Sequence, residues 1–309
     1  MSDPVDIGNW GVPLAILGGA IRVSTPFLFV SLGELLTERS GRINLGLEGT
    51  LVFGAMAGYA FAFESGSPWV GVLAAAFAGM LFGLLHGWIC HFPRVNDIAI
   101  GIALMLLGMG LAFFFGKPYI QPVAPDLPAS PFGAWSDIPQ VRAALNINVL
   151  FLIGIVLAVA IAWMFRSTRV GLIIRVVGDS TDAARAMGLK PDRIRLLSTA
   201  AGGALAGVGG AYLSLYYPGS WNEGISSGQG LMAVALVIFA RWNPVYCFWV
   251  ALLFGGAGAL GPALQSVGVT QGYYLFYAAP YVLTLGVLIA TSSRTQALTG
   301  APGALSITK

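Results

Sequence analysis

The sequence predicts an all-α membrane protein: a polytopic bundle of about nine transmembrane helices, within a range of eight to ten, in a single domain that spans residues 1–309. Composition is the first reason, because 57% of the residues are hydrophobic and only 9% are charged, whereas soluble domains usually carry about 25% charged residues. The second is that apolar runs of roughly 20 residues, the length that crosses a bilayer, recur along the chain. A soluble chain of this length could not bury so much apolar surface.

Nine apolar segments are candidates for membrane crossings. They occupy about residues 12–36, 44–63, 69–92, 97–117, 147–165, 194–217, 228–241, 244–262 and 270–291. The N-terminal stretch before the first segment has two acidic residues and no basic residue, the opposite of a secretory signal, so we expect this segment to be retained. The segments 228–241 and 244–262 are short and are separated by Arg241-Trp242-Asn243-Pro244, which allows either two crossings or one broken element.

The distribution of basic residues predicts the orientation of the bundle. Seven of the sixteen basic residues lie between Arg166 and Arg195. Basic residues near the ends of membrane helices tend to stay in the cytoplasm. With nine crossings and an outer N-terminus, thirteen basic residues fall inside and only Lys117 and Arg142 fall outside. We therefore expect the N-terminus outside, the C-terminus in the cytoplasm, and residues 166–195 on the cytoplasmic side.

The predicted outer loop, residues 118–146, is rich in proline. Its prolines are Pro118, Pro122, Pro125, Pro128, Pro131 and Pro139. This density excludes a spanning helix and favours extended or turn structure. The loop also contains Phe132 and Trp135, which could contact an extracytoplasmic partner or lie among lipid headgroups.

Glycines recur at intervals that place them on one face of a helix. Gly79, Gly83 and Gly87 are four residues apart, and pairs with the same spacing occur at 54 and 58 and at 203 and 207. Small residues at this spacing allow helices in lipid to approach closely. We expect close packing there, rather than a surface on which helices rock around a pathway.

No arrangement of residues predicts catalysis or metal binding. The nearest approach to a P-loop, at Gly110 to Pro118, has the wrong spacing, so the chain is not expected to hydrolyse nucleotide. His86 and Cys90 are one helical turn apart, but two ligands are too few for a metal site. Cys90 and Cys247, the two cysteines, lie in apolar segments and predict no disulfide framework. We expect no catalytic residue, no metal and no cofactor in this chain.

Charged residues within or beside membrane segments are more informative. Arg22, Glu34, Glu48 and Asp97 occupy such positions, where an unpaired charge is costly and usually faces protein, water or a partner. Glu48 follows Asn44-Leu45-Gly46-Leu47, a run that predicts a broken second helix, one that starts late or is interrupted. Glu48 could face a cavity, as at the broken helices of transporters, or could brace the break by accepting backbone N–H bonds.

The segment from Glu38 to Gly49, ERSGRINLGLEG, resembles the signature of the permease subunits of ABC importers for nucleosides. These subunits belong to a larger group that also serves simple sugars and branched-chain amino acids. Arg22, Thr25 and Pro26 match the same pattern, and the late segments ARWNP and GGAGALGP extend the resemblance over nearly the whole chain. Arg42 departs from the pattern, in which an apolar residue is more common.

The resemblance implies a permease in the cytoplasmic membrane of a bacterium that moves its substrate by alternating access. It also implies the partners: ATP-binding cassette subunits that hold ATP and Mg²⁺, a second homologous permease, an extracytoplasmic substrate-binding protein and membrane lipid, with no nucleic acid. The stretch Asp182, Ala183, Ala184 and Arg185, followed by Gly188, is similar to the loop by which such permeases dock their ATPase. We expect there a short amphipathic helix that begins at Ser180 or Thr181 and ends near Gly188, so that residues 166–195 form a coupling segment.

Three kinds of substrate are consistent with the sequence. The signature favours nucleosides, with simple sugars or a vitamin such as riboflavin as alternatives. Candidate residues for a polar pathway are Asn44, Glu48, Asn96, Asp97 and Gln229. An ion-coupled secondary transporter would use Glu48 and Asp97 instead, and its transport would persist without ATP but collapse with the ion gradient; a passive channel would need no ATPase.

Overall fold

A computed structural model describes residues 11–266, 275–276, 278–291 and 300–306. Six of its helices are long and apolar enough to cross a membrane. They are α1 (Gly11–Arg39), α3 (Pro68–Ile89), α4 (Asp97–Gly116), α6 (Val149–Ser167), α9 (Pro191–Leu215) and α11 (Pro244–Ser266). The predicted helical membrane architecture is confirmed, although these six are fewer than the nine segments predicted.

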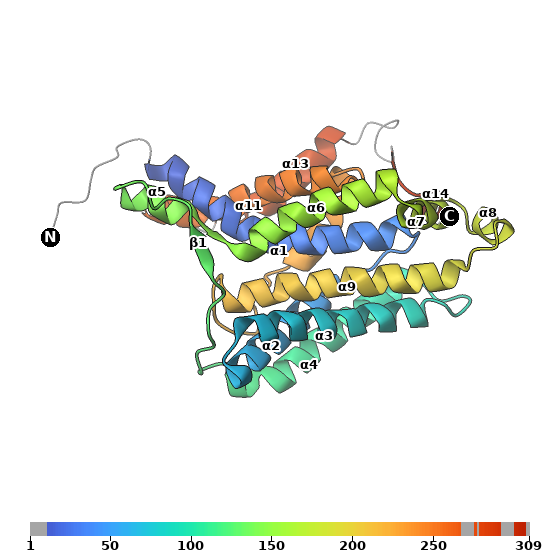
Figure 1. Cartoon of the computed structure of the whole chain (residues 1–309), viewed down its shortest axis with the longest axis horizontal. Coiled ribbons are helices and arrows are strands. Elements are labelled where there is room, and N and C mark those ends of the chain that lie inside the picture. The colour runs from blue at the N-terminus through green and yellow to red at the C-terminus, as the bar shows by residue number, and fades with distance from the viewer. Residues whose placement is uncertain (1–10, 267–274, 277, 292–299, 307–309) are drawn as a thin grey trace.

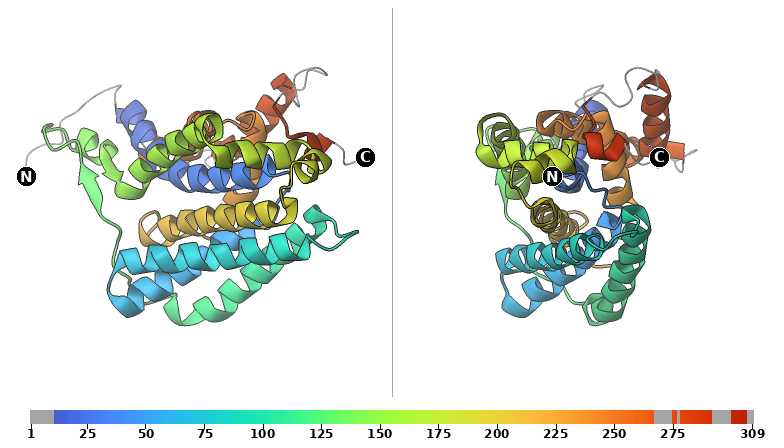
Figure 2. Two further views of the ribbon diagram at one scale, coloured as in Figure 1. Left: turned by 45° about the vertical axis from the view of Figure 1, so that its right-hand side comes forward. Right: turned by 90° about the vertical axis from the view of Figure 1, so that its right-hand side faces the viewer.

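The long helices run along a common axis and form two layers on either side of α9 (Figures 1 and 2). One layer contains α3, α4 and α2 (Leu47–Ser65), and the other contains α1, α6, α11 and α13 (Ala279–Thr291). Short elements mark the two ends of the bundle in Figure 1. We refer to the α5 end, where α5 (Pro139–Ala144) lies, and to the α8 end, where α7 (Arg169–Asp179), α8 (Thr181–Ala186) and α14 (Gly303–Ser306) lie.

The glycine faces pack as predicted. A Cβ atom added to Gly79 would lie 2.1 Å from the carbonyl oxygen of Gly203, and one added to Gly83 would lie 2.1 Å from that of Thr199. A Cβ on Gly54 would lie 2.7 Å from the Cα of Gly207. Only glycine therefore permits the observed approach of α2 and α3 to α9, which places α9 at the centre of the bundle.

The outer faces of the layers are apolar. Leu73 on α3, Phe114 on α4 and Val156 on α6 are each at least 67% exposed. An apolar surface of this extent is rare on a soluble monomer, but it suits a protein surrounded by lipid.

The second predicted segment begins late and is not interrupted. Residues 40–46 form turns and irregular chain, and α2 then runs without a break from Leu47 to Ser65. The Oδ1 atom of Asn44 accepts a hydrogen bond from the backbone N–H of Gly46 (2.9 Å), which holds the preceding chain in a turn. The expectation of a break inside the helix is therefore wrong, and that of a late start is confirmed.

The segments 228–241 and 244–262 are two separate helices, α10 (Gln229–Phe239) and α11. Arg241 and Trp242, in the turn between them, have positive φ angles of 49° and 52°. The 11 residues of α10 extend about 17 Å, roughly half of the 30 Å hydrocarbon core of a bilayer. Part of the last predicted segment, residues 270–274 and 277, lies outside the described residues.

The proline-rich segment contains only short elements. They are η2 (Lys117–Tyr119), β1 (Ala129–Pro131), α5 and β2 (Asn146–Asn148). The two strands pair antiparallel, with Ala129 opposite Asn148. The predicted lack of a spanning helix is confirmed, but α5, which begins at Pro139 as proline permits, was not predicted. Phe132 and Trp135 are exposed.

Candidate functional site: a carboxylate at the start of a half-length helix

Glu48 lies in the first turn of α2, is only 5% exposed and binds the start of α10. Its Oε1 atom accepts hydrogen bonds from the hydroxyl of Ser226 (2.5 Å) and the backbone N–H of Gly228 (3.0 Å). Its Oε2 atom accepts from the backbone N–H groups of Gly230 (2.6 Å) and Leu231 (3.3 Å). The first N–H groups of a helix have no partner within it and carry partial positive charge, so a carboxylate is well suited to cap them.

Two glycines make this contact possible. Gly228 has a φ of 80°, which turns the chain into α10. A Cβ atom on Gly230 would lie 2.6 Å from the Cα atom of Glu48, so a larger residue would push the two helices apart. Backbone bracing by Glu48, one of the two predicted roles, is therefore observed, but the helix braced is α10 and not α2 itself.

Irregular chain enters the bundle just before α10. Trp221 lies against Gly116 at the end of α4, whereas Ser226 already reaches Glu48 at the start of α2. Trp221 and Ser226 are 2% and 4% exposed. Non-helical backbone within a membrane is tolerated only where protein or a water-filled cavity surrounds it. Glu48 and its neighbours supply part of that surrounding.

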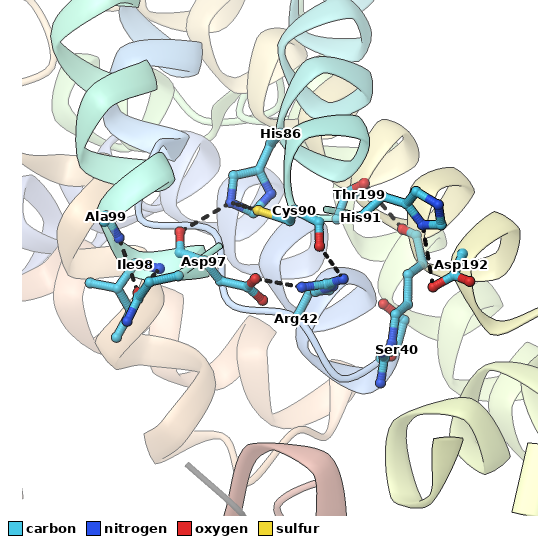
Figure 3. A network of polar contacts seen from close by, with 12 residues as sticks. Ser40, Arg42, His86, Cys90, His91, Asp97, Ile98, Ala99, Asp192 and Thr199 are labelled. Carbon is cyan, nitrogen blue, oxygen red and sulfur yellow. Dashed lines mark hydrogen bonds and ion pairs between the residues drawn. The ribbon is translucent and has the colours of Figure 1, made fainter. Parts of the chain in front are cut away.

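A second polar cluster lies near the α8 end and includes Arg42, the residue that departs from the permease pattern (Figure 3). Its Nη1 atom is 2.5 Å from Oδ1 of Asp97, the first residue of α4, and its Nη2 atom donates to the carbonyl of Cys90. Asn96 caps α4 by accepting from the N–H groups of Ile98 (2.8 Å) and Ala99 (3.2 Å). Arg42 thus joins the chain before α2 to the end of α3 and the start of α4.

His86 and Cys90 form a polar pair within this cluster. The Nε2 atom of His86 lies 3.7 Å from Sγ of Cys90 and 3.3 Å from the carbonyl oxygen of Asp97. Among the residues that the structure describes, no group of three or more His, Cys, Asp or Glu side chains could hold a metal ion.

The end of α1 is tied to two other segments by acidic side chains. Glu34 accepts through Oε1 from the backbone N–H of Asn44 (2.8 Å), and Glu38 accepts through Oε2 from the indole N–H of Trp242. Arg39 donates from Nε and Nη2 to the carbonyl oxygen of Trp242 at 3.1 and 2.8 Å. Glu38 and Trp242 were not predicted as site residues, although Glu38 opens the signature and lies one helical turn after Glu34.

The structure does not gather the five candidate pathway residues into one site. Glu48 binds the backbone at the start of α10, where Gln229 is the first residue, and Oε1 of Gln229 is buried without a hydrogen-bond partner in the described structure. Asn96 and Asp97 lie in the Arg42 cluster at the start of α4, and Asn44 is buried between Glu34 and Gly46.

The predicted short helix of the coupling segment is α8. Ser180 caps it by accepting from the backbone N–H of Ala183 (3.2 Å), and Gly188 follows it with a φ of 75°. Ala184 is fully buried and anchors the helix. The side chains of Asp182 and Arg185 are 96% and 60% exposed and lie 3.7 Å apart. The predicted limits of this helix are confirmed.

An amphipathic helix, α7, precedes α8 and was not predicted from the sequence. Thr168 caps α7 through a bond from the backbone N–H of Gly171 (3.2 Å), and α7 buries Gly171, Ile174, Val177 and Gly178. These buried residues recur every three to four positions, which is the spacing of one helix face. This periodicity in the sequence could have predicted α7.

Comparison with known proteins decides the family. Residues 16–291 match the family described as the permease component of the branched-chain amino acid transport system. The chain belongs to this family. Its six long apolar helices make it a multi-pass membrane protein.

Several relatives of this chain are named as ABC transporter permeases. A putative glucose ABC transporter permease of Haloferax volcanii is 33% identical, over 93% of this chain and 88% of the relative. A nucleoside ABC transporter permease of Lactococcus lactis is 30% identical, over 88% and 90%. A guanosine ABC transporter permease of Bacillus subtilis is 29% identical, over 91% and 93%. Haloferax volcanii and Lactococcus lactis each have a second such relative, 23% identical to this chain.

Proposed function

We propose that this chain is a transmembrane subunit of an ABC importer for nucleosides and that α8 docks the ATPase. The exposed helix α8 is the observation that carries this proposal. It is held to the bundle by Ala184, while Asp182 and Arg185 point charged groups into solvent at one end of the molecule. A short helix of this kind can insert into a groove of a separate subunit.

Hydrogen bonds link α8 to the rest of the bundle. Arg195, on α9, donates from Nη2 to Oγ1 of Thr181 at the start of α8 (2.8 Å) and from Nε to the carbonyl oxygen of Ser40 (3.1 Å). The turn that follows Ser40 leads through Asn44 to Glu48 and the start of α10. A displacement of α8 by the ATPase would reach α10 by this route, which supports alternating access.

In the proposed topology the α8 end faces the cytoplasm, the N-terminus lies outside and residues 118–146 form an outer loop. Nine membrane elements then comprise the six long helices, α2, α13 and the half-length α10, within one permease domain. The basic residues of the coupling segment from 166 to 195 support this orientation, because they cluster at the α8 end.

The substrate pathway is proposed to pass the start of α10. Transporters commonly place substrates where a helix is discontinuous, and Glu48 and Gln229 flank such a point here. Asn44, Asn96 and Asp97 are proposed to contribute through the turn before α2 and the start of α4. Because ATP and Mg²⁺ would bind to the ATPase, this chain needs no catalytic residue or cofactor.

The remaining proposed partners are an extracytoplasmic substrate-binding protein and a second, homologous permease. The paired relatives in Haloferax volcanii and Lactococcus lactis support a heterodimer.

Replacing Gly188 with valine is expected to reduce ATP-driven uptake about tenfold while membrane insertion is retained. An added Cβ atom meets nothing within 4 Å, so the change does not create a clash; it strains the positive φ that ends α8, at a cost of about 1–3 kcal/mol. Uptake and ATP hydrolysis should be measured together in liposomes containing the complete transporter.

Asparagine tolerates this backbone conformation, so Gly188→Asn is the matched control and should retain most uptake. Exchange of the charges at Asp182 and Arg185 should reproduce the valine phenotype, with ATP hydrolysis no longer linked to uptake. Normal uptake by the valine and charge-exchanged variants would contradict docking through α8.

Uptake of labelled guanosine by the complete transporter is expected to require ATP and to be inhibited by unlabelled nucleosides but not by excess glucose. The named nucleoside and guanosine relatives support this substrate. Glucose is the second candidate, because a putative glucose permease is 33% identical, and competition by glucose alone would favour it. Uptake that survives ATP removal but is abolished by an ionophore would indicate an ion-coupled transporter instead.

A further inference from the structure

A groove with a volume of about 470 Å³ lies at the α8 end, between the end of α3 and the chain that joins α8 to α9. Gly87, Trp88 and His91 line it from the end of α3 and the residues that follow it, and the other lining residues lie between Arg185 and Leu196. The groove is separate from the contacts of Glu48 with α10.

Positive charge is concentrated at this groove. Arg185, Lys190 and Arg193 all line it and all are exposed. Asp192 is the acidic residue among the lining residues, and its Oδ1 atom lies 3.5 Å from Nδ1 of His91. The three cations therefore outnumber the acidic group, which suits a ligand that carries an anionic phosphate.

The wall of the groove formed by α3 continues into an exposed apolar surface. Trp88 is preceded on α3 by Leu81, Phe77 and Leu73. These four side chains are exposed and are spaced seven, four and four residues apart, which places them on one face of the helix. Tryptophan is enriched where membrane meets water, so Trp88 marks the level at which headgroups would lie.

We propose that this groove binds the headgroup of an anionic phospholipid, with its phosphate among Arg185, Lys190 and Arg193 and its acyl chains along the exposed face of α3. The charge of the groove matches the phosphate, and the apolar stripe that leaves it matches the chains. Basic pockets between transmembrane helices on the cytoplasmic side bind such lipids in other membrane proteins. The location in the cytoplasmic leaflet rests on the proposed function, but the lipid site does not.

Native mass spectrometry of the full-length chain in neutral detergent tests this site. With phosphatidylglycerol and phosphatidylcholine supplied in equal amounts, the chain is expected to retain phosphatidylglycerol preferentially. Lys190→Gln combined with Arg193→Gln should lower the apparent affinity for phosphatidylglycerol about 30-fold, since each basic residue near anionic lipid contributes about fivefold. Arg185 is left unchanged because it belongs to the proposed docking helix.

Two further variants separate lipid binding from general charge and from misfolding. Arg169→Gln removes an exposed charge that does not line the groove and should leave retention unchanged. Asp192→Asn removes the acidic group and should raise the affinity about fivefold, a gain that a damaged fold would not produce.

Equal retention of the two lipids, or unchanged retention by the double variant, would overturn the proposal. So would displacement of the lipid by an equal concentration of glycerol 3-phosphate, since the site would then recognise soluble phosphate. None of these measurements depends on transport, so the lipid site and the proposed importer function can fail independently.

Discussion

Glu48→Ala is expected to destabilise the protein by about 3 kcal/mol or more and to abolish most uptake. The substitution removes the acceptor for the Ser226 hydroxyl and for three backbone N–H groups at the start of α10. Hydrogen bonds to charged groups contribute about 1.5–3 kcal/mol each, and buried donors left without a partner cost a similar amount. The separate losses are not additive, so the estimate is well below their sum.

The loss of stability should lower the midpoint of thermal unfolding in detergent by roughly 5 °C or more. It should also lower the amount of the protein recovered in the membrane. Glu64→Ala is the matched control, because Glu64 is on the same helix but is exposed and, within the described residues, accepts a hydrogen bond only from the hydroxyl of Tyr119 (3.2 Å). Glu48→Gln should be intermediate, because its amide nitrogen cannot accept from the N–H groups that face it. Equal tolerance of Glu48→Ala and Glu64→Ala would remove Glu48 from the site.

Gly79→Ala is expected to destabilise the bundle by about 1–3 kcal/mol through a single methyl group, and to reduce uptake with it. The new Cβ atom would lie 2.1 Å from the Gly203 carbonyl oxygen and 2.9 Å from the Gly207 nitrogen, so only a separation of α3 from α9 could accommodate it. Since α9 contacts helices of both layers, that separation would not remain local.

Gly110→Ala provides the control within another long helix. A Cβ atom there meets nothing within 4 Å, so alanine should be neutral or should stabilise α4 by up to about 1 kcal/mol through its higher helix propensity. Thermal unfolding and membrane content of the two variants, compared side by side, measure the effect of the contact rather than of the substitution. Identical behaviour would show that the close approach of α3 and α9 contributes nothing to stability.

The sequence predicted features that depend on local chemistry. Composition and apolar length identified the long helices, and the spacing of Gly79 and Gly83 identified the face that contacts α9. Ser180 and Gly188 delimited α8 because a capping side chain and a residue with positive φ act within a few residues of the helix ends.

Features that depend on distant contacts were not predictable in the same way. Glu48 was identified as a costly membrane charge, but its partners are about 180 residues away and are mostly backbone groups, which leave no trace in side-chain pattern. The contact of Glu38 with Trp242 is equally remote in sequence. The length of α10 was uncertain because an apolar run does not reveal where its helix begins within it.

Glu48 holds the start of α10 mainly through the main chain of that helix rather than through its side chains. Apart from the hydroxyl of Ser226, the partners of the carboxylate in the described structure are backbone N–H groups, which every residue except proline provides. The side chain of Gln229 takes no part in these hydrogen bonds, so a different side chain can stand at position 229 while the contact between Glu48 and the backbone of α10 is kept.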